Sequence, residues 1–433
     1  MHYAAPSRSS HSARSRQRPH RGAIGVLGVA LLLAPLLAPL PAQAEIRISL
    51  PSFFRIGPST SIELNTASRQ FRVKISGSIL FNEAEDDVHS LSGKASIQER
   101  RDGRTRRMVF ESESGGTIKR TYSVDGKAQA LDADGRRWLA EMLPVVLRET
   151  AMDSERRIKR IHAAGGVDAV VAEIERIESG HARRRYVEGI AKLAPLDDRQ
   201  QQRLLVVIAQ MDSDFGKRNA LSALAASQSL SAASQVDALR IVAAMDSSFE
   251  QRTVLTAMAP TLFADAGVAQ AWLNAASKID SDFELRSAID VLVRRDPLPA
   301  VHLDAAIQAT MKLDSDFEHA SALVAIGRQM ATATPAQVSS YLRSAQKIDS
   351  DFERRNVLTS FVSRNPLDKS GFLAVLQAID GMDSDFEIRT VLAAVAKRMP
   401  DDSELINRYR RTARSLGDHE RGQAEKALDR FTM

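Results

Sequence analysis

The chain has 433 residues, 44% of them hydrophobic, so it is long enough for two or three ordinary domains with buried cores. Its formal net charge of +5 comes from the first 44 residues, which carry five Arg and no acidic residue, whereas the rest holds 54 basic and 54 acidic residues. This neutral body argues against nucleic-acid binding, and the absence of Cys excludes disulfides, thiol catalysis and Cys-ligated zinc.

Residues 1–44 have the pattern of a secretory signal peptide. A polar, Arg-rich start precedes an apolar run from Ala23 to Leu40, and the segment ends in Ala42-Gln43-Ala44. These three parts predict export with cleavage after Ala44. A retained membrane anchor is the alternative, because the apolar run is nearly long enough to span a bilayer. We expect a periplasmic or secreted protein that contacts the membrane only if this segment is retained.

Residues 45–130 are predicted to form a small antiparallel β-meander of about four to six strands. Apolar and polar residues alternate over 71–75 and 118–124, which is the period-two pattern of half-exposed strands. Asp102-Gly103 and Asp125-Gly126 supply the positive φ that tight hairpin turns require. Five arginines surround one predicted hairpin tip: Arg100, Arg101, Arg104, Arg106 and Arg107. They form either a contact with an anionic surface or a solvated edge whose charge prevents aggregation.

Residues 131–164 are predicted to be a helical connector. Apolar residues from Trp138 to Leu147 recur at the spacing of one helix face, and acidic residues precede them, as suits the helix dipole. Trp138 is expected to pack in a core, since it lies within this apolar stripe; a ligand-binding aromatic is the alternative.

A five-residue motif, apolar-Asp-Ser-Asp-Phe, recurs six times at intervals of 34 or 35 residues. Its copies begin at Met211, Met245, Ile279, Leu313, Ile348 and Met382, and the second copy has Ser248 in place of the second Asp. A constant period of this length is typical of stacked helix pairs. Residues 165–433 are therefore predicted to form a right-handed, HEAT-like α-solenoid of about seven 34-residue helix-hairpin repeats plus a degenerate C-terminal cap. The predicted fold class is α+β.

Within each repeat, the motif is interpreted as the start of a helix. The Ser is predicted to be the N-cap, with a Glu three residues later completing a capping box. These six caps are Ser213, Ser247, Ser281, Ser315, Ser350 and Ser384. The second Asp is expected to pair with an Arg four residues later, as in Asp282 and Arg286. The Phe is expected to fill the core; a ligand-stacking surface is the alternative.

Two repeats lack one partner of the expected Asp and Arg pair. Ser248 leaves Arg252 without an acid, and Ala320 leaves Asp316 without a base. Arg252 and Asp316 are therefore the candidate exposed binding charges. Asp-Ser-Asp also resembles the start of a calcium loop, but the later oxygen ligands of such a loop are missing. No catalytic, metal-binding or cofactor-binding residue is predicted.

The repeats also resemble a known kind of protein. The pattern apolar-Asp-Ser-Asp-Phe-Glu-x-Arg-x-x-Leu is similar to Ser-Asp-x-Glu-(Lys/Arg) repeats of exported bacterial proteins of unknown function. It resembles the extracytoplasmic repeats of β-lactam-sensor-like membrane metallopeptidase antirepressors, and residues 134–144 are similar to the segment before those repeats. The resemblance covers about residues 60–430 and lacks the peptidase. It implies a sensing or scaffolding role with no catalytic residue.

Three functions are consistent with this sequence. The first is a non-enzymatic scaffold of the cell envelope that binds a protein or peptide on the concave face of the solenoid. The second is a sensor or regulatory module that works with a membrane signalling protein. The third is an envelope hydrolase whose catalytic residues are dispersed in the sequence. The repeat array without a catalytic motif favours the first.

Overall fold

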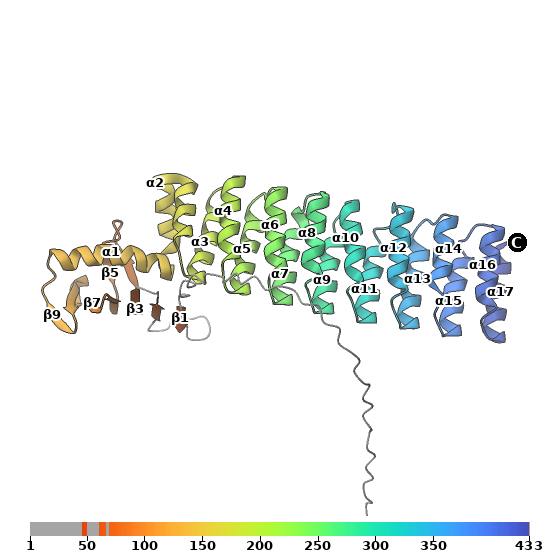
Figure 1. The fold of residues 1–433 in the computed structure, drawn as a ribbon, viewed down its shortest axis with the longest axis horizontal. Helices are drawn as coiled ribbons and strands as arrows, with labels where there is room; N and C mark the ends of the chain where they lie inside the picture. The colour runs from red at the N-terminus through yellow and green to blue at the C-terminus, as the bar shows by residue number, and fades with distance from the viewer. Residues whose placement is uncertain (1–45, 50–59, 66–68, 433) are drawn as a thin grey trace, which may run out of the picture. The chain divides into compact units, whose positions relative to one another are not determined.

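The computed structural model describes residues 46–49, 60–65 and 69–432, so the predicted signal peptide at residues 1–44 lies outside the described part. An antiparallel sheet with one helix comes first, and a helical repeat array follows it in the chain (Figure 1). The predicted α+β class with a helical solenoid is confirmed.

Seven antiparallel strands form one sheet in the order β1-β2-β3-β6-β7-β8-β9, while β4 and β5 form a separate hairpin. The sheet has more strands than expected. The strands are β1 (Ile46–Ser49), β2 (Thr60–Asn65), β3 (Arg69–Ser76), β4 (Ile79–Phe81), β5 (Val88–Leu91), β6 (Lys94–Arg101), β7 (Arg104–Ser112), β8 (Ile118–Val124) and β9 (Lys127–Gln129). Asp102 and Asp125 adopt positive φ together with the glycines that follow them, which makes the predicted tight turns.

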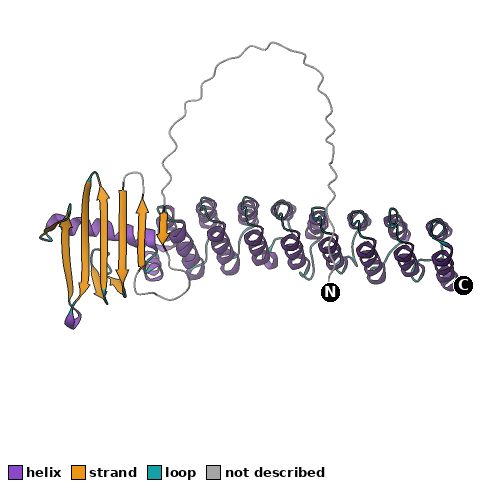
Figure 2. Cartoon of the chain, turned by 90° about the horizontal axis from the view of Figure 1, so that it is seen from below, coloured by secondary structure: helices purple, strands orange, loops and turns teal. Residues whose placement is uncertain are grey.

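The helix α1 (Ala133–Thr150) covers one face of this sheet and lies behind the strands in Figure 2. Phe71, Ile97 and Phe110 from the strands pack with Trp138 and Met142 from the helix. Trp138 is 3% exposed and its Nε1 donates a hydrogen bond to a Glu99 carboxylate oxygen at 2.7 Å. Trp138 is thus a core residue, as predicted. The helix shares the core of the sheet, and its last turn also contacts the start of the helical array.

Sixteen helices form the array in the described part of the chain, in two layers that Figure 2 shows end-on. They are α2 (Ser154–Glu175), α3 (Gly180–Leu193), α4 (Asp198–Ala209), α5 (Asp214–Ser227), α6 (Ala232–Ala243), α7 (Ser248–Met258), α8 (Ala266–Ala276), α9 (Asp282–Val293), α10 (Ala300–Thr310), α11 (Asp316–Gly327), α12 (Pro335–Ala345), α13 (Asp351–Arg364), α14 (Lys369–Ala378), α15 (Asp385–Ala396), α16 (Ser403–Ala413) and α17 (Asp418–Thr432).

Ala151 and Asp153 adopt left-handed backbone conformations between α1 and α2. The helix α2 is interrupted at Gly165 and Gly166, whose backbone angles are not helical, so two helical segments meet there. This break coincides with the predicted boundary of the array at residue 165. Short 3-10 segments occur at Ser114–Gly116 and Ala259–Thr261. The first helix pair of the array is therefore α2 with α3.

Two apolar positions of each motif repeat line the core, one in the helix before the motif and one in the helix that the motif begins. The residues ten positions after each motif start are buried: Leu221, Leu255, Ile289, Leu323, Leu358 and Leu392. Six positions before each start, Leu205, Leu239, Ile307, Leu342 and Leu376 are also buried, whereas Leu273 is half-buried. Because each helix pair buries one face against the next pair, these positions form one continuous core.

Two buried histidines lie within this helical core. The Nε2 of His319 is 2.8 Å from the Ser344 hydroxyl, which is 2.7 Å from the Thr310 hydroxyl. The Nδ1 of His302 is 3.0 Å from an Arg295 guanidinium nitrogen. Burial lowers the pKa of both histidines to about 4. Both rings are therefore neutral at pH 7.

These histidines should make the protein sensitive to mild acid. An unfolded His has a pKa of about 6.5. Because the folded pKa lies below that value, the stabilisation is complete above pH 6.5 and is lost as the pH falls towards 4. When the pH falls from 7 to 5, each His should lower the free energy of unfolding by about 1 to 2 kcal/mol. Urea unfolding at both pH values would measure this; equal pH dependence in wild type and His319→Gln would contradict it.

Candidate functional site

The six motifs lie at the starts of α5, α7, α9, α11, α13 and α15, which succeed one another along the array (Figure 1). In every copy the Ser hydroxyl accepts a hydrogen bond from the backbone N–H three residues later, which confirms all six N-caps. These bonds are long, at 3.4 Å. The predicted capping box is wrong, because the N–H of the capping Ser is bonded to another repeat in most copies.

The second Asp of the motif binds the backbone of the next repeat. In α9, Asp282 Oδ2 accepts from the N–H groups of Asp314 and Ser315 at 3.0 and 2.6 Å. The same two-bond contact is made by Asp214, Asp316 and Asp351. At the start of the array, the carboxylate of Glu149 in α1 accepts in the same way from the backbone N–H groups of Glu178 and Ser179. Burial raises the pKa of Glu149.

In five of the six motif repeats, the arginine also reaches the next repeat. Arg286 donates from Nε to Glu318 Oε2 at 2.5 Å, although Asp282 was the predicted partner. Four other pairs repeat this contact: Arg218 with Glu250, Arg252 with Glu284, Arg355 with Glu387 and Arg389 with Glu420. The predicted Asp and Arg pairing within a helix is wrong, because the Asp carboxylate is already occupied by backbone N–H donors.

The two charges predicted to be unpaired both have partners. Arg252 forms an ion pair with Glu284 at 2.7 Å. Asp316 accepts from the N–H groups of Asp349 and Ser350 at 3.0 and 2.7 Å. Both side chains are only partly exposed. Arg252 and Asp316 therefore hold the array together, and the prediction that they are free surface charges is wrong.

The motif phenylalanines are on the surface, which corrects the prediction that they fill the core. Phe215, Phe249, Phe283, Phe317, Phe352 and Phe386 are 51–62% exposed, and we call them the aromatic row. In an α-helix, two residues correspond to a rotation of about 200°. Phe283 precedes the buried Leu285 by two positions, so its side chain leaves the helix on the opposite side.

Guanidinium groups cover five of these six rings. The Arg three residues after the Phe places its guanidinium carbon 4.6–5.2 Å from the ring centroid. The same Arg side chains form the ion pairs to the next repeat. Each covered ring is thus held by a cation that is itself fixed by a carboxylate. Five of the six rings of the aromatic row are therefore held in this way.

The first Asp of each motif lies beside this row. Asp212, Asp246, Asp280, Asp314, Asp349 and Asp383 are exposed, and we call them the acidic row. Within residues 69–432, no side-chain hydrogen bond or ion pair of these six carboxylates is observed. Each Asp lies three residues before its Phe, at the same helix start. Each of the six motif repeats therefore presents one apolar ring together with one unpaired carboxylate.

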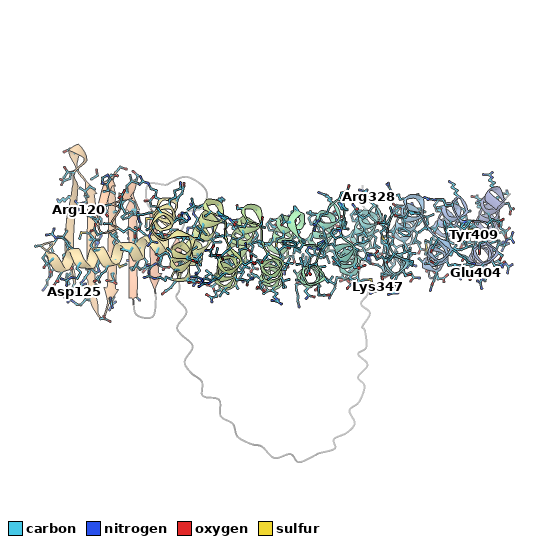
Figure 3. All side chains as sticks on the ribbon, turned by 90° about the horizontal axis from the view of Figure 1, so that it is seen from above. Arg120, Asp125, Arg328, Lys347, Glu404 and Tyr409 are labelled. Carbon is cyan, nitrogen blue, oxygen red and sulfur yellow. The ribbon has the colours of Figure 1, made fainter. Side chains whose placement is uncertain are left out.

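Other parts of the described chain offer weaker sites. A pocket of about 270 Å³ beside Trp138 is lined by Arg101, Arg104 and Arg106, but Glu99, Asp102 and Glu141 balance their charge. A pocket of about 350 Å³ between α9 and α11 contains Asp290, Arg294 and Arg328. Arg328 projects at the opposite edge of the array from Lys347, which directly precedes a motif (Figure 3). The pocket is therefore not part of the motif surface.

Comparison of the chain with protein-family models, with curated proteins and with solved structures gave no match. In the part that the structure describes, no helix is long and apolar enough to cross a membrane. No cluster of three His, Asp or Glu side chains suited to a metal ion occurs among the same residues.

The two rows were missed because the motif was treated as one helix in isolation. The helical phase between Phe283 and the core residues Leu285 and Ile289 was the available signal for an outward ring. For the acidic row, the signal was that neither capping nor pairing gave the first Asp a role.

Proposed function

We propose that the protein is a non-enzymatic scaffold of the bacterial cell envelope that binds an extended protein or peptide segment along the aromatic row. The observation that carries this proposal is the exposure of one phenylalanine in each of six successive repeats. Single exposed apolar residues are common on protein surfaces, but a regular series is not. Aromatic residues are enriched at the centres of protein interfaces. The export signal pattern in residues 1–44 supports the location.

The mounting of the rings favours binding. Arg286 covers Phe283 and is fixed by Glu318, and Asp282 ties the same helix start to the next repeat. A side chain that is ordered before binding loses little conformational entropy when a partner arrives. The row therefore offers apolar surface at a low entropic cost.

The spacing of the repeats suits an extended partner. Packed helices lie about 8–10 Å apart, so successive rings are separated by about one such step. A polyproline II helix advances about 9 Å in one three-residue turn, so every third side chain lies on the same face. In a β-strand, side chains three residues apart point to opposite faces. A segment lying along the row in the polyproline II conformation would therefore bring every third side chain over a ring. This predicts apolar residues with a period of three.

A displayed peptide library tests the proposal. We expect residues 45–433 to enrich peptides with apolar residues at every third position. The triple variant Phe249→Ala, Phe283→Ala, Phe317→Ala should bind an enriched peptide more than tenfold more weakly, because interface aromatics each contribute about 1 kcal/mol or more. Its urea midpoint should change little, since the rings are exposed.

The control is Val206→Ala, which removes a 59% exposed apolar side chain from α4, outside the row. Binding of the enriched peptide should be unchanged in that variant. If the library yields no period-three enrichment, or if the triple variant binds as well as the wild type, the row is not the binding surface.

A further inference from the structure

One repeat of the aromatic row lacks its arginine. In the repeat that begins at Leu313, the position three residues after Phe317 is Ala320. In the five other repeats, the residue at this position is the Arg that stacks on the ring and pairs with a Glu of the next repeat, at 2.5–2.7 Å. This repeat therefore has no cation of its own between ring and carboxylate.

The two groups that would hold that cation are both present. Phe317 is 62% exposed, whereas the five covered rings are 51–55% exposed. Glu353 is the carboxylate that corresponds to Glu318 and Glu387. Its one observed side-chain bond, from Asn356 Nδ2, is 3.4 Å long, and no ion pair to it is found among the described residues. The ring and the carboxylate therefore lack the guanidinium that bridges their equivalents.

We infer that Phe317 and Glu353 form a recognition site for the guanidinium group of an arginine in the bound segment. This inference rests on the proposed function, because the arginine is delivered by a chain lying along the aromatic row. Ala320 is buried, so the incoming guanidinium arrives over the exposed face of the Phe317 ring. The partner thus completes the series of stacked guanidinium groups from outside.

Guanidinium fits this site better than ammonium does. Its plane stacks on an aromatic face while its edge donates to a carboxylate, as Arg286 and Arg355 do in the flanking repeats. An ammonium is a compact, strongly hydrated charge that does not combine the two contacts in one plane. Asp314 and Asp349 of the acidic row add negative potential on the same surface, which favours a basic partner.

The test uses a fluorescein-labelled peptide of five Leu-Pro-Ser units in which Arg replaces the central Leu. Two matched peptides carry citrulline, the neutral isostere of Arg, or Lys at that position. Fluorescence anisotropy with residues 45–433 should show the Arg peptide binding about tenfold more tightly than the citrulline peptide, with the Lys peptide between them.

The decisive variant is Ala320→Arg, which supplies the missing guanidinium from within the chain. It should weaken binding of the Arg peptide about tenfold and leave binding of the citrulline peptide unchanged, while the melting temperature of the protein stays equal or rises. Ala331→Arg adds the same charge at an exposed position outside the motif surface and should not affect binding. Glu353→Gln, which retains the shape of the side chain, should also weaken binding of the Arg peptide.

The outcomes separate this inference from the proposed function. Equal binding of the Arg and citrulline peptides, or unchanged binding in both Ala320→Arg and Glu353→Gln, overturns the guanidinium site. If the triple Phe variant still loses binding in that case, the scaffold proposal stands without it. If Ala320→Arg does not fold, Glu353→Gln decides alone.

Discussion

Replacing Arg157 with Ala should lower the free energy of unfolding by about 3 to 5 kcal/mol, because this change removes a buried cation from a network of buried ion pairs. Arg157 is 6% exposed and forms ion pairs of 2.7 Å with both Glu85 and Glu173. Its guanidinium also donates to the Tyr186 hydroxyl at 2.9 Å. Glu85 and Glu173 are themselves buried, so water cannot replace the lost interactions.

The neighbouring Arg156 provides the control. Its side chain is 62% exposed and its one ion pair, to Asp153, is 3.9 Å long. Exposed ion pairs contribute about 0 to 1 kcal/mol, so Arg156→Ala should leave the urea midpoint almost unchanged. Similar losses of stability in the two variants would show that the cluster around Arg157 is not an essential buried network.

The second large effect concerns the contact that joins successive repeats. Asp282→Ala removes a carboxylate that accepts two backbone N–H groups of the next repeat, at 3.0 and 2.6 Å. Hydrogen bonds to a charged group contribute about 1.5 to 3 kcal/mol, and the two donors would lose their partner. We expect Asp282→Ala to destabilise the array by about 2 to 4 kcal/mol.

The first Asp of the same motif is the matched control for this prediction. Asp280 is exposed, and its side chain makes no observed hydrogen bond within the described residues. Asp280→Ala should therefore change the unfolding free energy by less than about 0.5 kcal/mol. Urea denaturation of both variants measures the difference. If Asp280→Ala is as destabilising as Asp282→Ala, the carboxylate contact between repeats does not have the role assigned to it.

Local patterns predicted the architecture well. The constant spacing of the motif indicated stacked helix pairs, and Ser281 and its equivalents are N-caps, because capping depends on the residues of one turn. Leu221 and Ile289 are buried because the 3.6-residue period assigns each to the inner face of its own helix. Trp138 belongs to an apolar stripe and packs in the core for the same reason.

The partners of the polar motif residues depend on neighbouring repeats. The carboxylate of Asp282 and the guanidinium of Arg286 were assigned to each other because they lie four residues apart, yet each is bonded to a group about 32 positions away. Only the stacking of one repeat on the next brings those groups within reach. The expectation that Arg252 and Asp316 are unpaired was wrong for this reason.

By itself, the sequence determined the repeat, its two helices, their caps and their inner faces, since all of these follow from interactions within one or two turns. The tertiary structure alone decided which groups join the repeats. The second Asp, the Arg and the Glu of the motif are used between repeats, whereas the six phenylalanines and the six first aspartates remain exposed. The motif that defines the array is therefore also the surface on which we expect its partner to bind.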